Sequence, residues 1–264
     1  MELLIASLVG IFVGTVVGAL GAGGGILAIP FLVFALKQNP HDAAAASLFI
    51  VGFSSLVSLF LRRRQVQWQQ GFLFAVLSIV GAVAGARLNV LVQPQYLLYS
   101  FCVLLVVIAF AMLSKARREQ AANGTKVTTT DAHAATQAHR RRPLWFLALC
   151  ATATGLLTGF FGIGGGIVIV PILVFALGFT MPLATATSLL VMVITAAVGL
   201  LARLGTGIHI DAGIVLFFTA GSMLGSAVGS KITRKARNST LTLAFAILLL
   251  GVAGATVTLT ALGY

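Results

Sequence analysis

A glycine-broken hydrophobic segment occurs twice in the chain, 141 residues apart. Residues 18–36 align without gaps to residues 159–177, and twelve of the 19 positions are identical. In each copy a glycine cluster is followed, five residues after its last glycine, by a proline. Paired segments interrupted by glycine and proline are the best sequence indicator of the substrate site in a membrane transporter made of two related halves. The repeat therefore predicts two related halves with a site between them.

The composition excludes an ordinary soluble fold. The chain is 59% hydrophobic and 8% charged, whereas a soluble domain carries about 25% charged residues. Apolar runs of about 20 residues, the length that crosses a bilayer as a helix, recur along the chain, and a membrane β-barrel would show short alternating segments instead. The sequence therefore predicts an all-α polytopic membrane protein. Cys102 and Cys150 have no metal-ligand or redox spacing, so we expect no metal and no cofactor.

The apolar runs divide into ten segments, five in each half. The first membrane repeat is predicted over residues 1–114, a mobile polar linker over 115–142, and the second repeat over 143–264. The predicted segments are about 3–20, 25–36, 43–61, 71–92 and 95–114, then 144–161, 166–177, 183–202, 211–230 and 239–260. The second segment of each half spans about 18 Å as a helix, against a hydrocarbon core of about 30 Å. We therefore expect it to be a broken half-helix.

The basic residues indicate how the chain crosses the membrane. The net charge is +12, and no nucleic-acid motif accompanies it. With ten segments and both termini outside, 14 of the 17 basic residues lie on the cytoplasmic side, in the groups at 62–64, 115–142 and 231–237, as the positive-inside rule requires. This predicts a membrane protein with a cytoplasmic linker. Because five segments per half is an odd number, the second half enters in the opposite sense, as an inverted-topology repeat.

The glycine clusters are the predicted substrate-binding elements. Gly23, Gly24 and Gly25 precede one half-helix, and Gly164, Gly165 and Gly166 precede the other. Backbone without side chains can approach a ligand closely, and the free amides and dipole at a helix N-terminus favour an anion. The alternative is that the glycines serve only close helix packing. We expect a hinge or structural role for Gly21, Gly162, Pro30 and Pro171.

Small hydroxyl residues follow each half-helix and are further candidates. Ser47 in the first half matches Ser188 in the second, and Thr187 precedes Ser188. Their hydroxyls can donate hydrogen bonds to an oxyanion, or they can bond back to their own helix. Arg87 and Lys231 occupy matching places after two glycines and could attract an anion at each mouth, although snorkelling toward the interface is the more frequent role.

Acidic residues are rare and lie outside the predicted segment centres. The five are Glu2, Asp42, Glu119, Asp131 and Asp211. Transporters of cations and protons place carboxylates inside the membrane, so this pattern favours an anionic substrate.

The two copies of Gly-x-Gly-Gly-Gly followed by proline and a small-residue serine segment resemble the TauE/SafE family of sulfite exporters, also called TSUP transporters. The matching positions are Gly23–Gly25 with Pro30, and Gly164–Gly166 with Pro171 and Thr187–Ser188. Ala46 stands where the pattern has the threonine in the other half. The resemblance covers both halves and implies a bacterial or archaeal transporter of the inner (cytoplasmic) membrane. Its implied substrates are sulfur-containing oxyanions, with sulfite, sulfoacetate and other organosulfonates, and thiosulfate as the candidates.

We therefore expect a carrier, and not an enzyme, that exports a small sulfur oxyanion by alternating access within the lipid bilayer. A passive anion channel and a non-transporting membrane subunit of a complex are the alternatives. The sequence leaves open whether a proton or sodium ion drives transport, and whether two copies form a homodimer.

Overall fold

The computed structural model describes residues 2–21, 24–35, 38–123, 144–162, 165–203, 212–233 and 238–261. Over these ranges every element is helical, which confirms the all-α prediction. The elements are α1 (Glu2–Leu20), α2 (Gly25–Pro30), the π-helix η1 (Phe31–Ala35), α3 (Pro40–Arg62), the 3-10 helix η2 (Arg63–Gln65), α4 (Trp68–Leu91), α5 (Pro94–Asn123), α7 (Leu144–Phe161), α8 (Gly166–Ala176), α9 (Met181–Ala202), α10 (Ala212–Thr233) and α11 (Asn238–Ala261).

The lengths of these helices agree with a polytopic membrane protein. Within the described ranges, five helices are long and apolar enough to cross a membrane: His41–Gln65, Trp68–Leu91, Met181–Ala202, Gly213–Lys231 and Ser239–Thr258. Each half also contains the short second helix, which runs over 25–35 as α2 and η1 in the first half and over 166–176 as α8 in the second. Pro30 lies where α2 changes to the π-helix, as expected of a residue that cannot donate a helical hydrogen bond.

The segment between the halves differs in part from the prediction. α5 continues to Asn123, nine residues into the range predicted as the linker. These residues include three alanines and several Arg, Glu and Gln residues, which are good helix formers. The remainder of the linker, together with Gly23, Gly164 and Asp211, lies outside the described residues.

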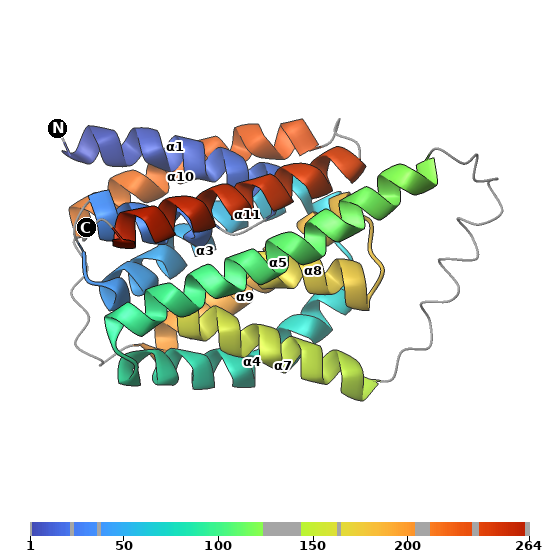
Figure 1. The fold of residues 1–264 in the computed structure, drawn as a ribbon, viewed down its shortest axis with the longest axis horizontal. Helices are drawn as coiled ribbons and strands as arrows, with labels where there is room; N and C mark the ends of the chain where they lie inside the picture. The colour runs from blue at the N-terminus through green and yellow to red at the C-terminus, as the bar shows by residue number, and fades with distance from the viewer. Residues whose placement is uncertain are drawn as a thin grey trace.

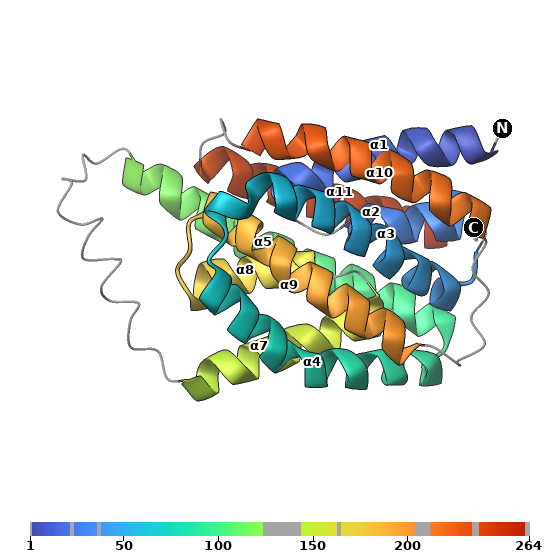
Figure 2. The ribbon, with the colours of Figure 1, turned by 180° about the vertical axis from the view of Figure 1, so that it is seen from behind.

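The helices form layers around the two half-helices. α1 and α10 lie side by side along one edge, and α4 and α7 along the opposite edge (Figures 1 and 2). Between these edges, α5 and α11 cross on one face and α3 and α9 on the other. α2 contacts α3 and α11, and α8 contacts α9 and α5. Both half-helices are therefore enclosed between the two faces.

Glycine seams join the helices along each edge. On α1, Gly10, Gly14 and Gly18 face the backbone of Phe218, Ser222 and Ser226 on α10, and Gly221, Gly225 and Gly229 face α1 in return. On the other edge, Gly81 and Gly85 of α4 meet α7, and Gly155 and Gly159 of α7 meet α4. Residue numbers rise together along both seams, so the paired helices run parallel. Small residues let helix backbones approach closely in a membrane, and these glycines have that role.

The two central helices run in opposite directions. A Cβ atom added to Gly52 of α3 would lie 3.5 Å from Ala196 Cβ of α9, and one added to Gly199 would lie 3.2 Å from Leu48 Cδ1. Along this contact the residue numbers rise on α3 as they fall on α9, so the two helices are antiparallel. Because α3 and α9 hold equivalent places in the two halves, this antiparallel contact has the geometry that an inverted repeat requires.

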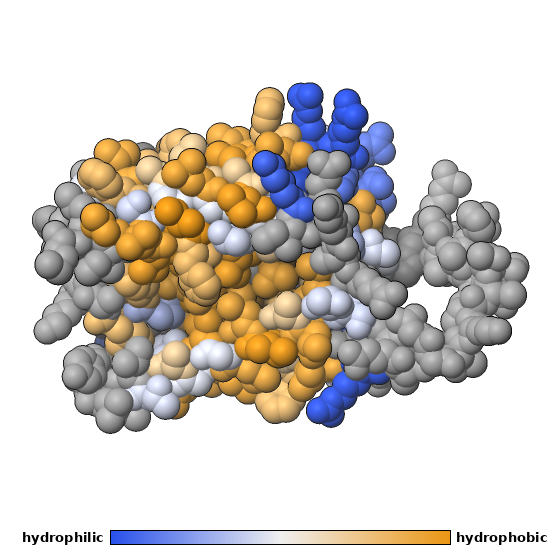
Figure 3. Space-filling model, turned by 90° about the horizontal axis from the view of Figure 1, so that it is seen from above, coloured by the Kyte–Doolittle hydropathy of each residue, from blue (hydrophilic) through white to orange (hydrophobic). Residues whose placement is uncertain are grey.

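Charge is concentrated at one end of the helix bundle. Hydrophilic side chains gather at the end where α5 extends beyond the other helices, and the rest of the described surface in this view is mainly apolar (Figure 3). We call this the basic end, defined by Arg62–Arg64, Arg117 and Lys231. Helix α1 begins and helix α11 ends at the other end of the bundle (Figure 1), which we call the terminal end.

Candidate functional site

The starts of the two half-helices provide backbone amides without helical partners. Before α8, Gly165 has a left-handed φ of 81°, and its carbonyl accepts from the amides of Val168 and Ile169 at 2.9 and 2.8 Å. Before α2, the Gly24 carbonyl accepts from Leu27 and Ala28 at 3.2 and 2.8 Å. The amides ahead of these donors have no acceptor within the helix, and the helix dipole places positive potential on them.

Both half-helix starts are enclosed in this conformation. A Cβ at Gly24 would lie 3.0 Å from Val17, 3.3 Å from Val13 and 3.5 Å from Val51. Because Val51 is in the middle of α3, α2 begins deep within the bundle. A Cβ at Gly165 would lie 2.5 Å from the Thr158 hydroxyl oxygen. Gly24, Gly25, Gly165 and Gly166 are all buried, so a ligand can reach these amides only after side chains or helices move.

We call the glycine-rich segment before each half-helix, which includes Gly21 or Gly162, a glycine break. Each glycine break accepts a hydrogen bond from the long central helix of the other half. Ser188 of α9 donates to the carbonyl of Gly21 at 3.1 Å, and Ser47 of α3 donates to the carbonyl of Gly162. Gly21 and Gly162 have left-handed φ values of 59° and 69°. Ser188 lies 141 positions after Ser47, and Gly162 lies 141 positions after Gly21. The two contacts are therefore equivalent in the repeat.

A buried arginine forms hydrogen bonds near each contact, to Thr185, which accepts from Ser188, or to Gly159, three residues before Gly162. At the basic end Arg62 is 2% exposed and donates from Nη2 to Pro182 O at 2.8 Å and to Thr185 Oγ1 at 3.0 Å. At the terminal end Arg203 is 3% exposed and donates from Nη2 to Gly159 O at 2.8 Å. Burial lowers the pKa of Arg203 to about 10, so its guanidinium remains charged at neutral pH. We name these groups the basic-end clasp (Gly21, Arg62, Thr185, Ser188) and the terminal-end clasp (Gly162, Ser47, Arg203).

The structure separates the two serines that the sequence placed in one site. Each is the eighth residue of its helix, in α3 and α9, which contain 23 and 22 residues. Since these helices are antiparallel, Ser47 lies toward the terminal end and Ser188 toward the basic end. Each hydroxyl has a single donor hydrogen, which it shares with a carbonyl of its own helix, Ala44 O for Ser47 and Thr185 O for Ser188, each at 2.9 Å.

Thr187 and the two matched cations have other surroundings. The Thr187 hydroxyl accepts from the Gln67 amide at 3.3 Å, and its methyl group lies beside Gly71, so this side chain faces α4. Arg87 and Lys231 are exposed near the ends of α4 and α10, in agreement with snorkelling. Pro171 is buried within α8, and its role as a hinge stays a prediction.

Arg62 and Arg203 are the polar residues that sequence reasoning missed. The positive-inside argument places Arg62 with its neighbours in a cytoplasmic group, and Arg203 lies outside the three basic groups that the argument uses. Their separation of 141 residues, the offset of the glycine repeat, was the available signal. When every polar residue is compared with the residue 141 positions later, the identical pairs are Ser47 with Ser188 and Arg62 with Arg203.

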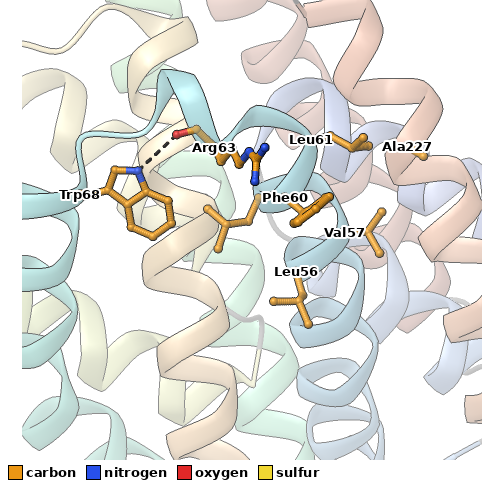
Figure 4. A pocket seen from close by; sticks show the side chains of 8 residues that line it. Leu56, Val57, Phe60, Leu61, Arg63, Trp68 and Ala227 are labelled. Atoms are coloured by element: carbon orange, nitrogen blue, oxygen red, sulfur yellow. Dashed lines mark hydrogen bonds between the residues drawn. The ribbon is translucent and has the colours of Figure 1, made fainter.

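An apolar groove opens on the side of the helix bundle, near the basic end (Figure 4). Its volume is about 780 Å³, and it is lined by Leu56, Val57, Leu59, Phe60, Leu61, Arg63, Trp68 and Ala227. Trp68 Nε1 donates to Arg63 O at 3.2 Å, which closes one side. Because its walls are aliphatic and aromatic, the groove suits lipid chains better than a small anion. Among the described residues, no cluster of three His, Cys, Asp or Glu side chains could hold a metal ion.

The comparisons with known proteins agree with this architecture. The family model described as "Sulfite exporter TauE/SafE" matches residues 6–256. A "Probable membrane transporter protein" of Xylella fastidiosa (strain 9a5c) is 30% identical over 228 residues, which cover 84% of this chain and 82% of the relative. The "Probable membrane transporter protein YunE" of Bacillus subtilis (strain 168) is 27% identical over 262 residues, 95% of each chain.

A relative of archaeal origin extends the similarity. The "Probable membrane transporter protein MJ0441" of Methanocaldococcus jannaschii is 28% identical over 245 residues, 85% of each chain. No solved structure matches the chain. The family match over nearly the whole length, with relatives that are membrane transporters and not enzymes, agrees with the multi-pass helical fold. The chain therefore belongs to the TauE/SafE sulfite exporter family of membrane transporters.

Proposed function

We propose that this transporter exports small sulfur-containing oxyanions, with sulfite, sulfoacetate and related organosulfonates as candidates, by alternating access between its two ends. The name of the matching family model supports this substrate class. The observation that carries the mechanism is the pair of equivalent clasps, Ser188 on Gly21 and Ser47 on Gly162. Each clasp closes one end of the bundle, and each joins one half to the other.

Alternating access follows from opening one clasp at a time. The described conformation has both clasps formed and both half-helix starts buried, which we interpret as an occluded state. Opening the basic-end clasp frees the break at Gly21 and gives access from that end. Opening the terminal-end clasp does the same at Gly162. Since the two halves form an inverted repeat in this proposal, the two open states are equivalent in energy to a first approximation.

The bound anion is held by backbone amides. Those of Gly25 and Gly166, with Gly23, Gly24, Gly164 and Gly165 beside them, provide donors at the starts of the half-helices. Ser47 and Ser188, one toward each end of the bundle, provide hydroxyl donors when their present partners are released. Hydrogen bonds from neutral amides hold an anion without the desolvation cost of a buried cation.

The charges of the bundle favour an anion over a cation. The acidic residues that the structure describes, Glu2, Asp42 and Glu119, lie at or near helix ends. The buried charged side chains of the described core are Arg62 and Arg203. A cation passing between the halves would meet the positive potential of these arginines, and none of the described carboxylates lies in the middle of a helix to offset it.

The orientation in the membrane follows from the basic end. We propose that this end is cytoplasmic, because Lys and Arg are retained on that side. Both termini are then outside, residues 115–142 are cytoplasmic, and the membrane is the inner membrane.

The test is flux of ³⁵S-sulfite and labelled sulfoacetate through proteoliposomes. We expect saturable flux in the native chain and loss of flux in Gly165→Leu, since the added side chain meets Thr158 and Ile169 at the start of α8. Gly254→Leu is the matched control, because a Cβ at Gly254 has no neighbour within 4 Å among the described residues. Flux retained by Gly165→Leu, or absent from the native chain for every sulfur oxyanion, contradicts the proposal.

A further inference from the structure

Arg62 is a buried cation whose described hydrogen-bond partners are all neutral. Nε donates to Gln65 Oε1 at 3.2 Å, and Nη2 donates to Pro182 O and Thr185 Oγ1. Among the described residues, Nη1 has no hydrogen-bond partner although it is buried. A buried guanidinium needs an anion and a full set of acceptors to offset its lost hydration. A negatively charged group with oxygen acceptors would supply both the charge and the acceptor that Nη1 lacks among the described residues.

A pocket lies next to this arginine at the basic end. It has a volume of about 360 Å³ and is lined by Phe60, Leu61, Arg62, Arg63, Arg64 and Gln65. Arg63 and Arg64 are exposed, whereas Arg62 is the buried member of the lining. Three guanidinium groups on consecutive residues create a positive potential that concentrates anions at the pocket. An anion that enters it arrives beside the unpartnered Nη1 once the Arg62 side chain shifts.

Arg62 is also linked to the basic-end clasp. Its Nη2 bonds to Thr185, and the Thr185 carbonyl accepts from Ser188, which holds Gly21. A guanidinium that turns toward an oxyanion gives up its hydrogen bonds to the first turn of α9. Binding at this position therefore weakens the contact that closes the basic end.

We propose that Arg62 is the anion-binding residue of a port at the basic end, where it takes an oxyanion and releases the clasp. This rests on the proposed transport of sulfur oxyanions. The planar guanidinium can present two parallel N–H donors to a sulfite or sulfonate group, which an ammonium group cannot do. Arg62 acts only at the basic end, because the equivalent residue at the terminal end is Arg203. Substitution of Arg62 should therefore affect anion binding from the basic face alone.

The experiment measures KM separately on the two faces. Right-side-out and inside-out membrane vesicles carry the native chain, Arg62→Gln, Arg62→Lys and Arg203→Gln, with ³⁵S-sulfite as the transported anion. We expect Arg62→Gln and Arg62→Lys to raise KM about tenfold or more at the basic face, the size of one lost charged hydrogen bond, with little change at the terminal face. Arg203→Gln should show the opposite pattern. Arg117→Gln, which removes an exposed arginine of α5 at the same end, controls for surface charge.

A second readout does not depend on flux. Sulfite and methanesulfonate should raise the melting temperature of the purified native chain, and Arg62→Lys should lose most of that shift while it keeps its own basal melting temperature within a few degrees. Equal KM at the basic face in native and both Arg62 variants, or an equal change at both faces, overturns the port. If the native chain transports no sulfur oxyanion but shows the Arg62-dependent shift, the proposed function fails and the anion site stands. If Arg62→Gln does not fold, Arg62→Lys decides both readouts.

Discussion

Ser188 of α9 donates its hydroxyl hydrogen bond to the carbonyl oxygen of Gly21 at 3.1 Å. The bond joins a long helix of one half to the glycine break of the other. Its counterpart joins Ser47 to Gly162. Since all four residues are buried, each bond satisfies a carbonyl that water does not reach. The two contacts hold the halves together at opposite ends of the bundle.

Ser188→Ala should destabilise the folded chain. The Gly21 carbonyl then loses a buried donor, for which we expect a loss of about 1 kcal/mol in the free energy of unfolding. Reversible denaturation in mixed detergent micelles measures this. Ser114→Ala, which removes an exposed hydroxyl bonded only within α5 at Ala111 O, should change the free energy by less than about 0.5 kcal/mol. Equal effects in the two variants would mean that the clasp contributes no stability.

Gly21→Ala should be more damaging than the loss of the serine. Gly21 has φ 59°, and an added Cβ would lie 2.6 Å from Thr185 O and 2.8 Å from Thr185 Cβ. The left-handed conformation alone costs an alanine about 1–2 kcal/mol, and the backbone contact adds to this cost. The free energy of unfolding of Gly21→Ala should therefore fall by more than about 2 kcal/mol.

The control for this substitution is Gly254→Ala. Gly254 lies inside α11 with open space around it, so alanine should be neutral or stabilise by up to about 1 kcal/mol. A stable Gly21→Ala chain would show that the break does not need glycine.

The glycine seam between α1 and α10 makes a separate prediction. A Cβ at Gly14 would run into the backbone carbonyl of Ser222, and only separation of the two helices can relieve that contact. Gly14→Val should lower the free energy of unfolding by about 2 kcal/mol or more. The measurement is the same denaturation assay, with Gly251→Val, which has no neighbour within 4 Å among the described residues, as control. A similar loss in both variants would trace the effect to valine in a helix and not to the seam.

The main architecture could be predicted from the sequence because it depends on local signals. Apolar length predicted the long helices, and the short run after each glycine cluster predicted α2 and α8. The glycines that precede Arg87 and Lys231, among them Gly81 and Gly225, lie at helix–helix seams. The extension of α5 to Asn123 was missed because polarity was taken to indicate a linker, although helix propensity there is high.

The clasps could not be predicted in the same way because they depend on contacts between halves. A hydroxyl near the start of a long helix can bond within its own helix or to another segment, and Ser47 does both. Arg62 stands in a run of three arginines, which indicates a loop at the membrane surface. Its burial becomes clear only when α9 packs over it. The partners of Ser47 and the burial of Arg62 depend on how the two halves pack together, which the sequence of one segment does not reveal.

Anion selectivity should be visible in the stability of the purified native chain. A ligand at 100 times its dissociation constant stabilises the native state by about 2.7 kcal/mol. We expect sulfite and sulfoacetate to raise the melting temperature, and chloride and choline at equal concentration and ionic strength to leave it unchanged. An equal rise in melting temperature with choline would contradict an anion site. A rise with chloride but not with sulfite or sulfoacetate would show that the site does not select sulfur oxyanions.

Counterflow tests the carrier mechanism most directly. Proteoliposomes loaded with unlabelled sulfite are diluted into trace ³⁵S-sulfite, with membrane voltage clamped at zero by potassium and valinomycin. Alternating access predicts a transient accumulation of label above its equilibrium level, because each outward step of unlabelled anion returns the site to bind labelled anion. A chain that lets label only equilibrate, with no overshoot and no acceleration by internal sulfite, is a channel, and that result would contradict the account.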